Sequence, residues 1–381
     1  MVIRPGRAPV RSFETLFTQA LRILRRFGSD AHVYLSGAAG ATPNGLQSGN
    51  YTLSDGSTGY AAVDGPVGLV LDAMGTVGSE LAPATTSTAG WTNNGLASIT
   101  SDGTTLTVQN TGAAEGQASF GAAIANATYQ VTINVTNIFG SGRVTIGGTT
   151  TSLGGSTGLK SFFVVAASTA GVVVASNNAT GSGVIGFNTF SVKQVTGIHA
   201  TQPTTANKPT LRLSSGKYHW QLDGGDSFLT GNIGFTNAMT IVIAGRIDSL
   251  ASINFLTSED TGGCEVYVKT DGAVVIEKAI IAFLATSPAS SIAAGTSFVI
   301  TARLSAGTAS IRKNGAQIVS AGTASVFSAT TGMRIGARFA GTLNVNGVLS
   351  CVIPMPYALT DAECLLVERF AASTLPNAPS F

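Results

Sequence analysis

Carboxylates are the side chains of this sequence that could cleave a sugar bond. Glycoside hydrolysis uses two of them, placed on either side of the bond. Five acidic residues gather in one stretch: Glu259, Asp260, Glu265, Asp271 and Glu277. The first two adjoin a Gly-Gly turn, and the other three do not alternate along one strand. The spacing therefore indicates no catalytic pair, and we assign no catalytic residue.

The sequence also shows no motif for nucleophilic catalysis, phosphate binding or metal binding. The three histidines have no neighbouring Ser, Cys or Asp in a triad-like motif, although a triad can be assembled from distant residues. The three cysteines are odd in number and lack metal-type spacing, which favours folding in a reducing cytoplasm. No G-x-x-x-x-G-K-[ST] phosphate loop is present. The residues concerned are His32, His199, His219, Cys264, Cys351 and Cys364.

Aromatic side chains are the candidates for binding. Trp91 follows a glycine and is either a platform for stacking a sugar ring or part of a core. Tyr218, Trp220 and Tyr267 fall on predicted strands, so some of them face outward as contact residues and the others face the core. We expect any sugar contact to involve members of this group of four.

Two aspartates are candidates for a metal ion. Asp223 and Asp226 lie in a glycine-rich turn, and Ca²⁺ prefers oxygen ligands. Acidic residues in such a turn more often form the turn itself. We therefore expect no metal site and no cofactor.

The elements that position these residues form a β-rich C-terminal region, 210–375. Short runs of Val, Ile, Phe and Thr recur between turn signals, which is typical of an antiparallel sandwich. Asp271-Gly272 and Asn314-Gly315 predict tight hairpins. Thr360 and Glu363 form a capping box that begins a helix ending near residue 372. The predicted strands are 217–223, 239–247, 264–269, 298–304, 309–312, 333–337 and 343–354.

This region resembles the laminin-G-like, concanavalin-A-like lectin modules. Residues 218–228 resemble their opening strand, 311–316 their central hairpin, and 333–336 with 358–363 their closing strands and helix. The resemblance implies a jelly-roll sandwich that usually binds glycans or proteins and occasionally hydrolyses sugars. Hydrolytic members carry Glu-x-Asp-x-x-Glu on one strand, and this sequence has no such motif.

A second β-rich module is predicted at 79–195. Residues 129–135 alternate apolar and polar side chains, as in a strand with one buried face. The order of strands and the early Gly-Trp turn resemble carbohydrate-binding-module-like jelly rolls. Residues 196–209, with prolines at 203 and 209, are interpreted as a linker. The expected fold is mainly β: two antiparallel β-sandwich (jelly-roll) modules preceded by an N-terminal amphipathic helix and connector, 1–75.

The N-terminal helix is predicted over residues 12–28. Apolar side chains recur on one face and arginines gather on the other, with Ser12 suited to the N-cap. An isolated helix of this length is marginal in water, so its apolar face needs a partner. The expected assembly anchor comprises Arg4, Arg7, Arg11, Phe13, Phe17, Leu21, Arg22, Leu24, Arg25 and Arg26.

Charge bears on what that partner is. Six arginines against Glu14 give +5 over residues 1–28, whereas the whole chain is +2. We favour docking into a protein assembly over packing on the chain's own following domain, with a membrane surface or nucleic acid the weakest alternatives. The apolar run 162–175 is about 14 residues, too short to span a bilayer.

The basic helix and residues 63–72, VDGPVGLVLD, resemble the N-terminal region of tailed-phage virion proteins. The resemblance implies a virion protein made in the host cytoplasm, with other virion proteins as partners and a homo-oligomer, a trimer first, as its state. Only 10% of residues are charged, which suits tight assembly. We expect a non-enzymatic component for surface decoration or attachment to a host glycan. The alternatives are a glycan-specific tail-fibre adhesin and a polysaccharide depolymerase.

Overall fold

The computed structural model describes most of the chain after residue 76. Before that point it describes residues 18–20, 22–23, 33–35, 50–51, 64, 67 and 69–70. After it, the gaps are 113–114, 178–181, 203, 231–232, 234, 236–237, 261, 279–280, 306, 323–326, 328–331 and 340–342. The described part is mainly β with antiparallel sheets in sandwich-like units, which confirms the predicted fold class.

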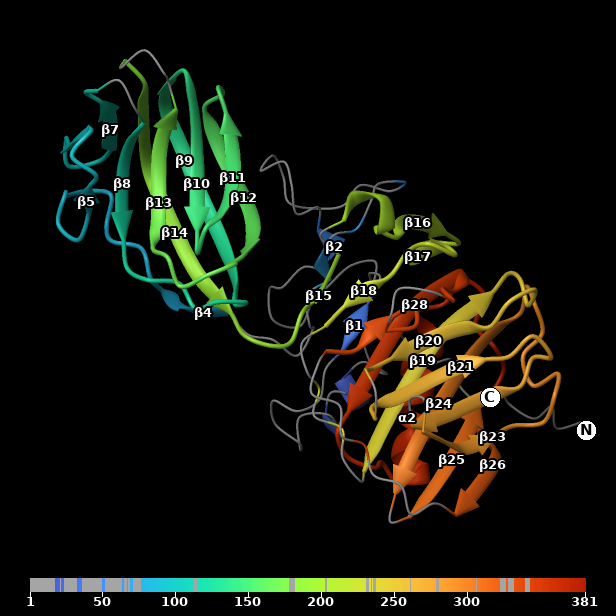
Figure 1. Ribbon diagram of the computed structural model, residues 1–381. Helices are drawn as coiled ribbons and strands as arrows, with labels where there is room; N and C mark the ends of the chain where they lie inside the picture. Colours follow the sequence, from blue (N-terminus) through green and yellow to red (C-terminus); the bar gives the residue numbers. More distant parts are fainter. Residues whose placement is uncertain are drawn as a thin grey trace, which may run out of the picture.

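Residues 77–195 form one sandwich, the inserted module, shown in cyan to green in Figure 1. Its sheets run β11-β10-β13-β8-β5 and β12-β9-β14-β7-β6, with β4 beside β14. Buried and exposed side chains alternate along β9 because one face of the strand meets the opposite sheet. The strands are β4 (Val77–Glu80), β5 (Thr92–Asn93), β6 (Ala97–Ser101), β7 (Leu106–Asn110), β8 (Gly116–Phe120), β9 (Thr128–Phe139), β10 (Ser141–Ile146), β11 (Thr149–Gly154), β12 (Gly158–Val165), β13 (Val172–Asn177) and β14 (Val184–Val195).

The second sandwich, the C-terminal module, is built from two larger sheets. One runs β16-β17-β28-β19-β24-β25-β26 with β1 beside β28, and the other runs β2-β3-β15-β18-β27-β20-β21-β22-β23. Its early strands are β1 (Tyr34–Leu35), β2 (Asn50–Tyr51), β3 (Leu69–Val70), β15 (Ala200–Thr201), β16 (Thr210–Ser214), β17 (Lys217–Asp223) and β18 (Phe228–Leu229). The others are β19 (Met239–Ile247), β20 (Asn254–Ser258), β21 (Cys264–Val268), β22 (Val274–Lys278), β23 (Ala282–Thr286), β24 (Ser297–Ser305), β25 (Thr308–Lys313), β26 (Ala316–Gly322), β27 (Arg334–Ile335) and β28 (Asn346–Met355).

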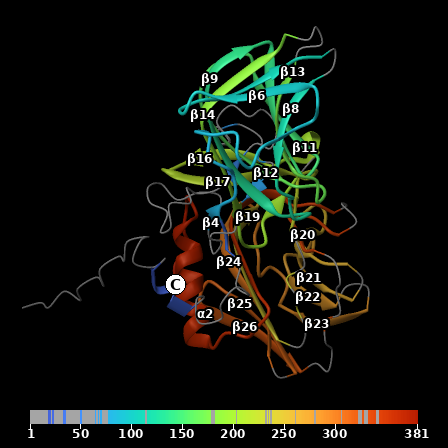
Figure 2. The same ribbon diagram turned by 90° about the vertical axis from the view of Figure 1, so that its left-hand side faces the viewer.

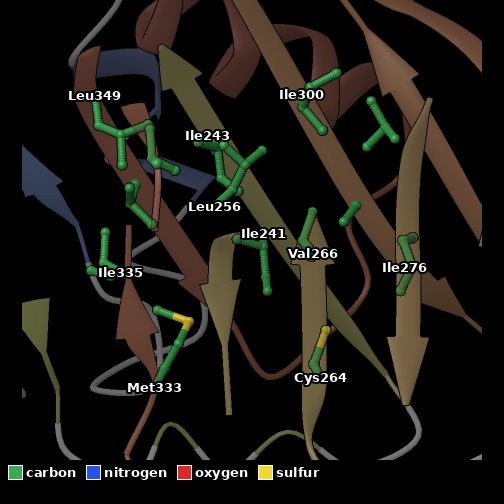
Figure 3. Packing of buried hydrophobic residues seen from close by; sticks show 14 of the residues in the cluster. Ile241, Ile243, Leu256, Cys264, Val266, Ile276, Ile300, Met333, Ile335 and Leu349 are labelled. Atoms are coloured by element: carbon green, nitrogen blue, oxygen red, sulfur yellow. The ribbon is translucent and has the colours of Figure 1, made fainter. Parts of the chain in front are cut away.

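The core of the C-terminal module lies between these sheets. Figure 3 shows Ile241, Ile243 and Ile300 of the first sheet facing Leu256 and Val266 of the second. These side chains are fully buried. Burial of this apolar surface is the main force that holds the two sheets together.

The N-terminal segment belongs to the C-terminal module wherever it is described. Tyr34 pairs with Val352 of β28, and Val70 of β3 pairs with Ala200 of β15. Tyr34, Val67 and Val70 are buried in the C-terminal core. The prediction of a separate N-terminal unit, 1–75, is therefore wrong for these residues. Residues 200–201, which were expected to belong to the linker, form β15 and pair with β3.

The inserted module thus interrupts the C-terminal module, and the chain passes between the two modules twice. Val77 of β4 pairs with Val195 of β14 on one side of the junction. On the other side, Leu69 of β3 pairs with Thr201 of β15. The two connections consequently leave each module from adjacent strands.

One helix, α2 (Asp361–Ser373), covers the outer face of the first C-terminal sheet (Figure 2). Its N-cap is Thr360, and the predicted capping box with Glu363 is present. Beside it lie the helical residues 18–20 and 22–23, whose Ala20 and Ile23 join the buried cluster formed by α2 and the sheet. Among the described residues, no helix has the length and apolar character needed to cross a bilayer. A 3-10 turn, η2 (Thr205–Asn207), precedes β16.

Candidate functional site

Trp91 is a core residue of the inserted module. Its ring centroid lies 5.1 Å from that of Phe120 and 5.8 Å from that of Phe187, both in edge-to-face geometry. Its Nε1 donates to the carbonyl of Ala84 at 3.3 Å, and only 9% of the residue is exposed. The indole faces are covered by protein, so the stacking-platform interpretation is wrong and the core alternative holds.

Two further aromatic candidates are also enclosed. Trp220 is fully buried and packs edge-on against Phe228, with 5.2 Å between ring centroids. Tyr267 stacks on Phe255 at 4.7 Å and is 5% exposed. Both therefore match the core alternative that the sequence left open, because the protein interior and neighbouring rings enclose them. Tyr218 alone among the four retains partial exposure.

Asp223 and Asp226 form a turn. Asp223 Oδ1 accepts from the Gly225 amide at 2.8 Å, and Asp226 Oδ2 accepts from the Asp223 amide at 3.3 Å. Burial, followed by the negative charge of Asp223, raises the pKa of Asp226 to about 7. In the described part of the chain, no group of three or more His, Cys, Asp or Glu residues could hold a metal ion.

Most of the expected assembly anchor lies outside the described residues, namely Arg4, Arg7, Arg11, Phe13, Phe17, Leu21, Leu24, Arg25 and Arg26. Arg22 is described and exposed. The described apolar residues of this helix, Ala20 and Ile23, are buried against α2. At these two positions the apolar face therefore meets the chain's own C-terminal module.

Two carboxylates of the acidic stretch lie opposite each other on the outer face of the second C-terminal sheet. The hairpin of β21 and β22 places Glu265 opposite Glu277. Glu265 Oε1 accepts from Ser258 Oγ at 2.9 Å and from Arg338 Nε at 3.3 Å. Tyr267 donates its hydroxyl to Glu277 Oε2 at 2.7 Å. Sequence spacing missed this pair because the hairpin register, not a local motif, brings the two residues together.

Both carboxylates of this pair accept hydrogen bonds from neighbouring side chains. Burial raises the pKa of Glu265, although Ser258 and Arg338 oppose the shift. Burial and the neighbouring Glu277 raise the pKa of Tyr267 well above its ordinary value, which makes its phenol a poor nucleophile. Both Glu265 and Tyr267 are almost fully buried, so neither presents its reactive atoms to a bound sugar.

A cleft lies where the two modules meet, with a volume of about 400 Å³. Both modules and the connection after β14 contribute to its wall, and β15 and β18 face the inserted module at this place (Figure 1). We name it the inter-module cleft. Its described lining comprises Asn126, Thr128, Val165, Gly197, Ile198, His199, Thr201, Leu229 and Thr230.

Regular structure fixes the position of the cleft walls. Thr128, the first residue of β9, pairs with both Val165 and Val195 at one end of its sheet. On the opposite wall, Thr201 pairs with Leu229. Tyr34 donates its hydroxyl to the carbonyl of Ile198 at 2.6 Å and so ties the connection to the C-terminal core.

Acidic side chains and the strongly basic Lys and Arg are absent from the cleft as far as it is described. His199 is the one titratable residue of its described lining. His199 is buried, with Nε2 3.2 Å from the carbonyl oxygen of Val195. Sequence analysis did not find this site because its residues come from four separated segments and have no shared spacing.

No protein-family model matches this chain, and no curated protein matches it. Among solved structures, Trypanosoma rangeli sialidase in complex with the inhibitor DANA has a TM-score of 0.37 and 12% identity, covering 47% of this chain and 30% of the sialidase. The Ruminococcus gnavus IT-sialidase CBM40 bound to alpha2,3 sialyllactose has a TM-score of 0.32 and 14% identity, covering 39% of this chain and 96% of that one. This chain therefore spans less than a third of the sialidase's length, and likeness at this level assigns it neither ligand nor activity.

Proposed function

We propose that this chain is a non-enzymatic structural component of a phage particle whose β-sandwich modules attach to surface glycans. The observation that carries the attachment is the inter-module cleft, whose described wall includes the exposed Asn126 and the half-buried Thr201, without Asp, Glu, Lys or Arg. Hydroxyl and amide groups both donate and accept, as a sugar's hydroxyls require. Concave sites with a few convergent polar groups are where proteins bind small ligands.

We propose that the chain attaches to glycans and does not hydrolyse them, because of where its carboxylates lie. Hydrolysis needs two carboxyl groups beside the sugar, one of them able to donate a proton. The described cleft lining supplies none. Glu265 and Glu277, which do lie opposite each other, are held by Ser258, Arg338 and Tyr267.

The phage role and its partners rest on the sequence resemblance of the N-terminal region. In this proposal the arginine-rich start of the chain contacts other virion proteins, and the assembled form is a homo-oligomer, with a trimer as the first expectation. Replacing Arg4, Arg7 and Arg11 with alanine tests this role while leaving the buried Ala20 and Ile23 in place. We expect particles to lose the protein, as detected by antibody labelling of purified particles. Normal incorporation of the triple variant would contradict the anchoring role.

Glycan attachment is tested by blocking the cleft. Leu229 lines it and is 37% exposed, so a Leu229→Trp variant fills the opening without removing a core side chain. The matched control is Leu213→Trp, on a leucine of the same module that is 47% exposed and outside the cleft lining. We expect full-length protein and the control to bind a glycan array, and Leu229→Trp to bind at least tenfold more weakly. The proposal would be contradicted if the full-length protein bound no glycan or released sugar fragments.

A further inference from the structure

We propose that the inter-module cleft binds an uncharged saccharide unit that touches both modules at once. The inference rests on the proposed glycan attachment and adds the charge class of the ligand and its position. It stands on three features of the described residues: the polarity of the lining, its lack of Asp, Glu, Lys and Arg, and its origin in two modules.

The lining alternates polar and apolar groups. Asn126 is exposed and Thr201 half-buried, so they bring an amide and a hydroxyl, whereas Val165 and Leu229 bring apolar surface. The other two threonines of the lining are almost fully buried, and Thr230 Oγ1 accepts from the Met333 amide at 3.1 Å. Thr201 Oγ1 donates to the carbonyl of Leu229 at 3.4 Å, which leaves lone pairs of this oxygen to accept from a ligand hydroxyl. A sugar ring presents hydroxyls at its edge and C–H groups on its faces, so both kinds of lining have a counterpart in it.

The absence of Arg and Lys from the described lining selects against acidic sugars. The one titratable side chain there, His199, is buried and has its Nε2 3.2 Å from the carbonyl oxygen of Val195. A carboxylate moved from water into a cleft without a cation loses hydration that nothing replaces. Arg and Lys, which would pair with such a group, are missing from the described lining. A neutral saccharide has no such penalty, because each hydroxyl needs only a hydrogen-bond partner.

The origin of the lining places the ligand across the junction. Thr128 and Val165 belong to the inserted module, whereas Thr201 and Leu229 belong to the C-terminal module. A ligand that fills about 400 Å³ between them touches both walls. This volume is near the small end of ligand sites, which suits a unit of about one or two sugar residues.

The charge class is tested on a glycan array that holds neutral oligosaccharides beside the same oligosaccharides capped with sialic or uronic acid. We expect wild-type protein to bind a neutral member at least tenfold more tightly than its acidic counterpart. Leu229→Lys places a cation at the cleft, and we expect it to reduce the preference in affinity for the neutral over the acidic oligosaccharide. Equal or tighter binding of the acidic member by wild-type protein would overturn the neutral assignment while leaving glycan attachment intact.

The position is tested by calorimetric unfolding of the full chain with the best neutral oligosaccharide from the array. Each module has its own core, so we expect two transitions, and a ligand held by both modules raises both. Leu229→Trp should abolish both shifts and Leu213→Trp should keep them. Asn126→Gly, which suits the positive φ of 64° at this residue, serves as a second cleft variant with weakened shifts. A shift confined to one transition, or binding unchanged in both cleft variants, would show that the sugar sits elsewhere.

Discussion

The carboxylates with shifted pKa values are shifted in opposite directions in the two sandwiches. In the inserted module the pKa values of Glu80, Asp102 and Glu115 are lowered. In the C-terminal module those of Asp226, Glu259 and Glu265 are raised. The same residue types in two sandwiches therefore differ in pKa through burial and through the donors around them.

The inserted module keeps its acids near solvent and surrounds them with donors. Arg143 hydrogen-bonds to both oxygens of Glu115, and this contact lowers the pKa of Glu115 although burial opposes it. Asp102 accepts from the Thr105 and Thr104 amides at 2.7 and 2.9 Å, which lowers its pKa in turn. In each case the ionised form is the one that the fold stabilises.

The C-terminal module encloses Glu259 instead. This residue is fully buried, and its Oε2 accepts from the Cys264 amide at 2.8 Å. No described residue donates to Oε1. Burial therefore raises the pKa of Glu259 to about 7. The larger core stabilises the neutral acid, and the two modules should respond to pH with opposite signs.

The largest expected effect comes from a buried ion pair between β25 and α2, formed by Arg312 and Glu368. Arg312 Nε donates to Glu368 Oε1 at 2.8 Å, and Thr301 donates to the same oxygen at 2.7 Å. Glu368→Ala removes the buried partner of Arg312 and leaves only the exposed Asp361, whose Oδ1 lies 3.6 Å from Arg312 Nη1, so the C-terminal transition should lose about 3 kcal/mol, the low end for a broken buried pair. Denaturant unfolding of the full chain measures this loss, with the transition of the inserted module unchanged.

A double variant separates the buried charge from the loss of packing. Replacing both Arg312 and Glu368 with methionine removes the two charges together and should cost less than Glu368→Ala alone. A loss below about 1 kcal/mol in the single variant would mean that this ion pair resembles an exposed one.

The second effect is the pH dependence of the C-terminal module. Because the folded-state pKa of Glu259 lies above the ordinary value of 4.5, the folded state binds more protons between these values. The stability that Glu259 contributes is therefore fully present at pH 4.5 and below, and it is lost as the pH rises through about 7. The loss is on the order of 3 kcal/mol at most.

Glu259→Gln tests this assignment, because a neutral amide cannot titrate. The C-terminal transition of the variant, measured at pH 5 and pH 8, should differ less than that of wild-type protein, with Asp226 supplying a remaining dependence of the same sign. The inserted module should change little between pH 5 and pH 8 and should lose stability only below about pH 4.5, since carboxylates of lowered pKa lose their stabilisation as the pH falls through their folded-state values. If the C-terminal module were more stable at pH 8 than at pH 5, the proposed difference between the two modules would be wrong.

Much of the fold could be predicted from local patterns. The strands at 217–223 and 239–247 were predicted with the bounds that the structure shows, because runs of strand-forming residues between turn residues are local signals. The capping box at Thr360 is another local signal. The interruption of one sandwich by the other was missed, because pairs such as Tyr34 with Val352 join residues that no sequence window spans.

The site was harder to predict for the same reason. Trp91 looks identical in sequence whether its ring faces a sugar or Phe120, and only packing decides between the two. The cleft is made of Thr, Leu and Val from separated segments, which are residue types that carry no motif. Asp223 and Asp226 did carry a local signal, and the turn they form matches the plainer of their two interpretations.

The smallest effect is the counterpart of the Glu368 variant in the inserted module. The Arg143 and Glu115 side chains are 26% and 20% exposed, against 6% and 0% for Arg312 and Glu368. Water can replace part of what Glu115→Ala removes, so the inserted transition should fall by only about 0.5–1 kcal/mol at neutral pH. The variant should also lose less stability than wild-type protein on acidification, because the carboxylate whose pKa is lowered is gone. If Glu115→Ala costs as much as Glu368→Ala in the same unfolding experiment, burial is not what distinguishes the two modules.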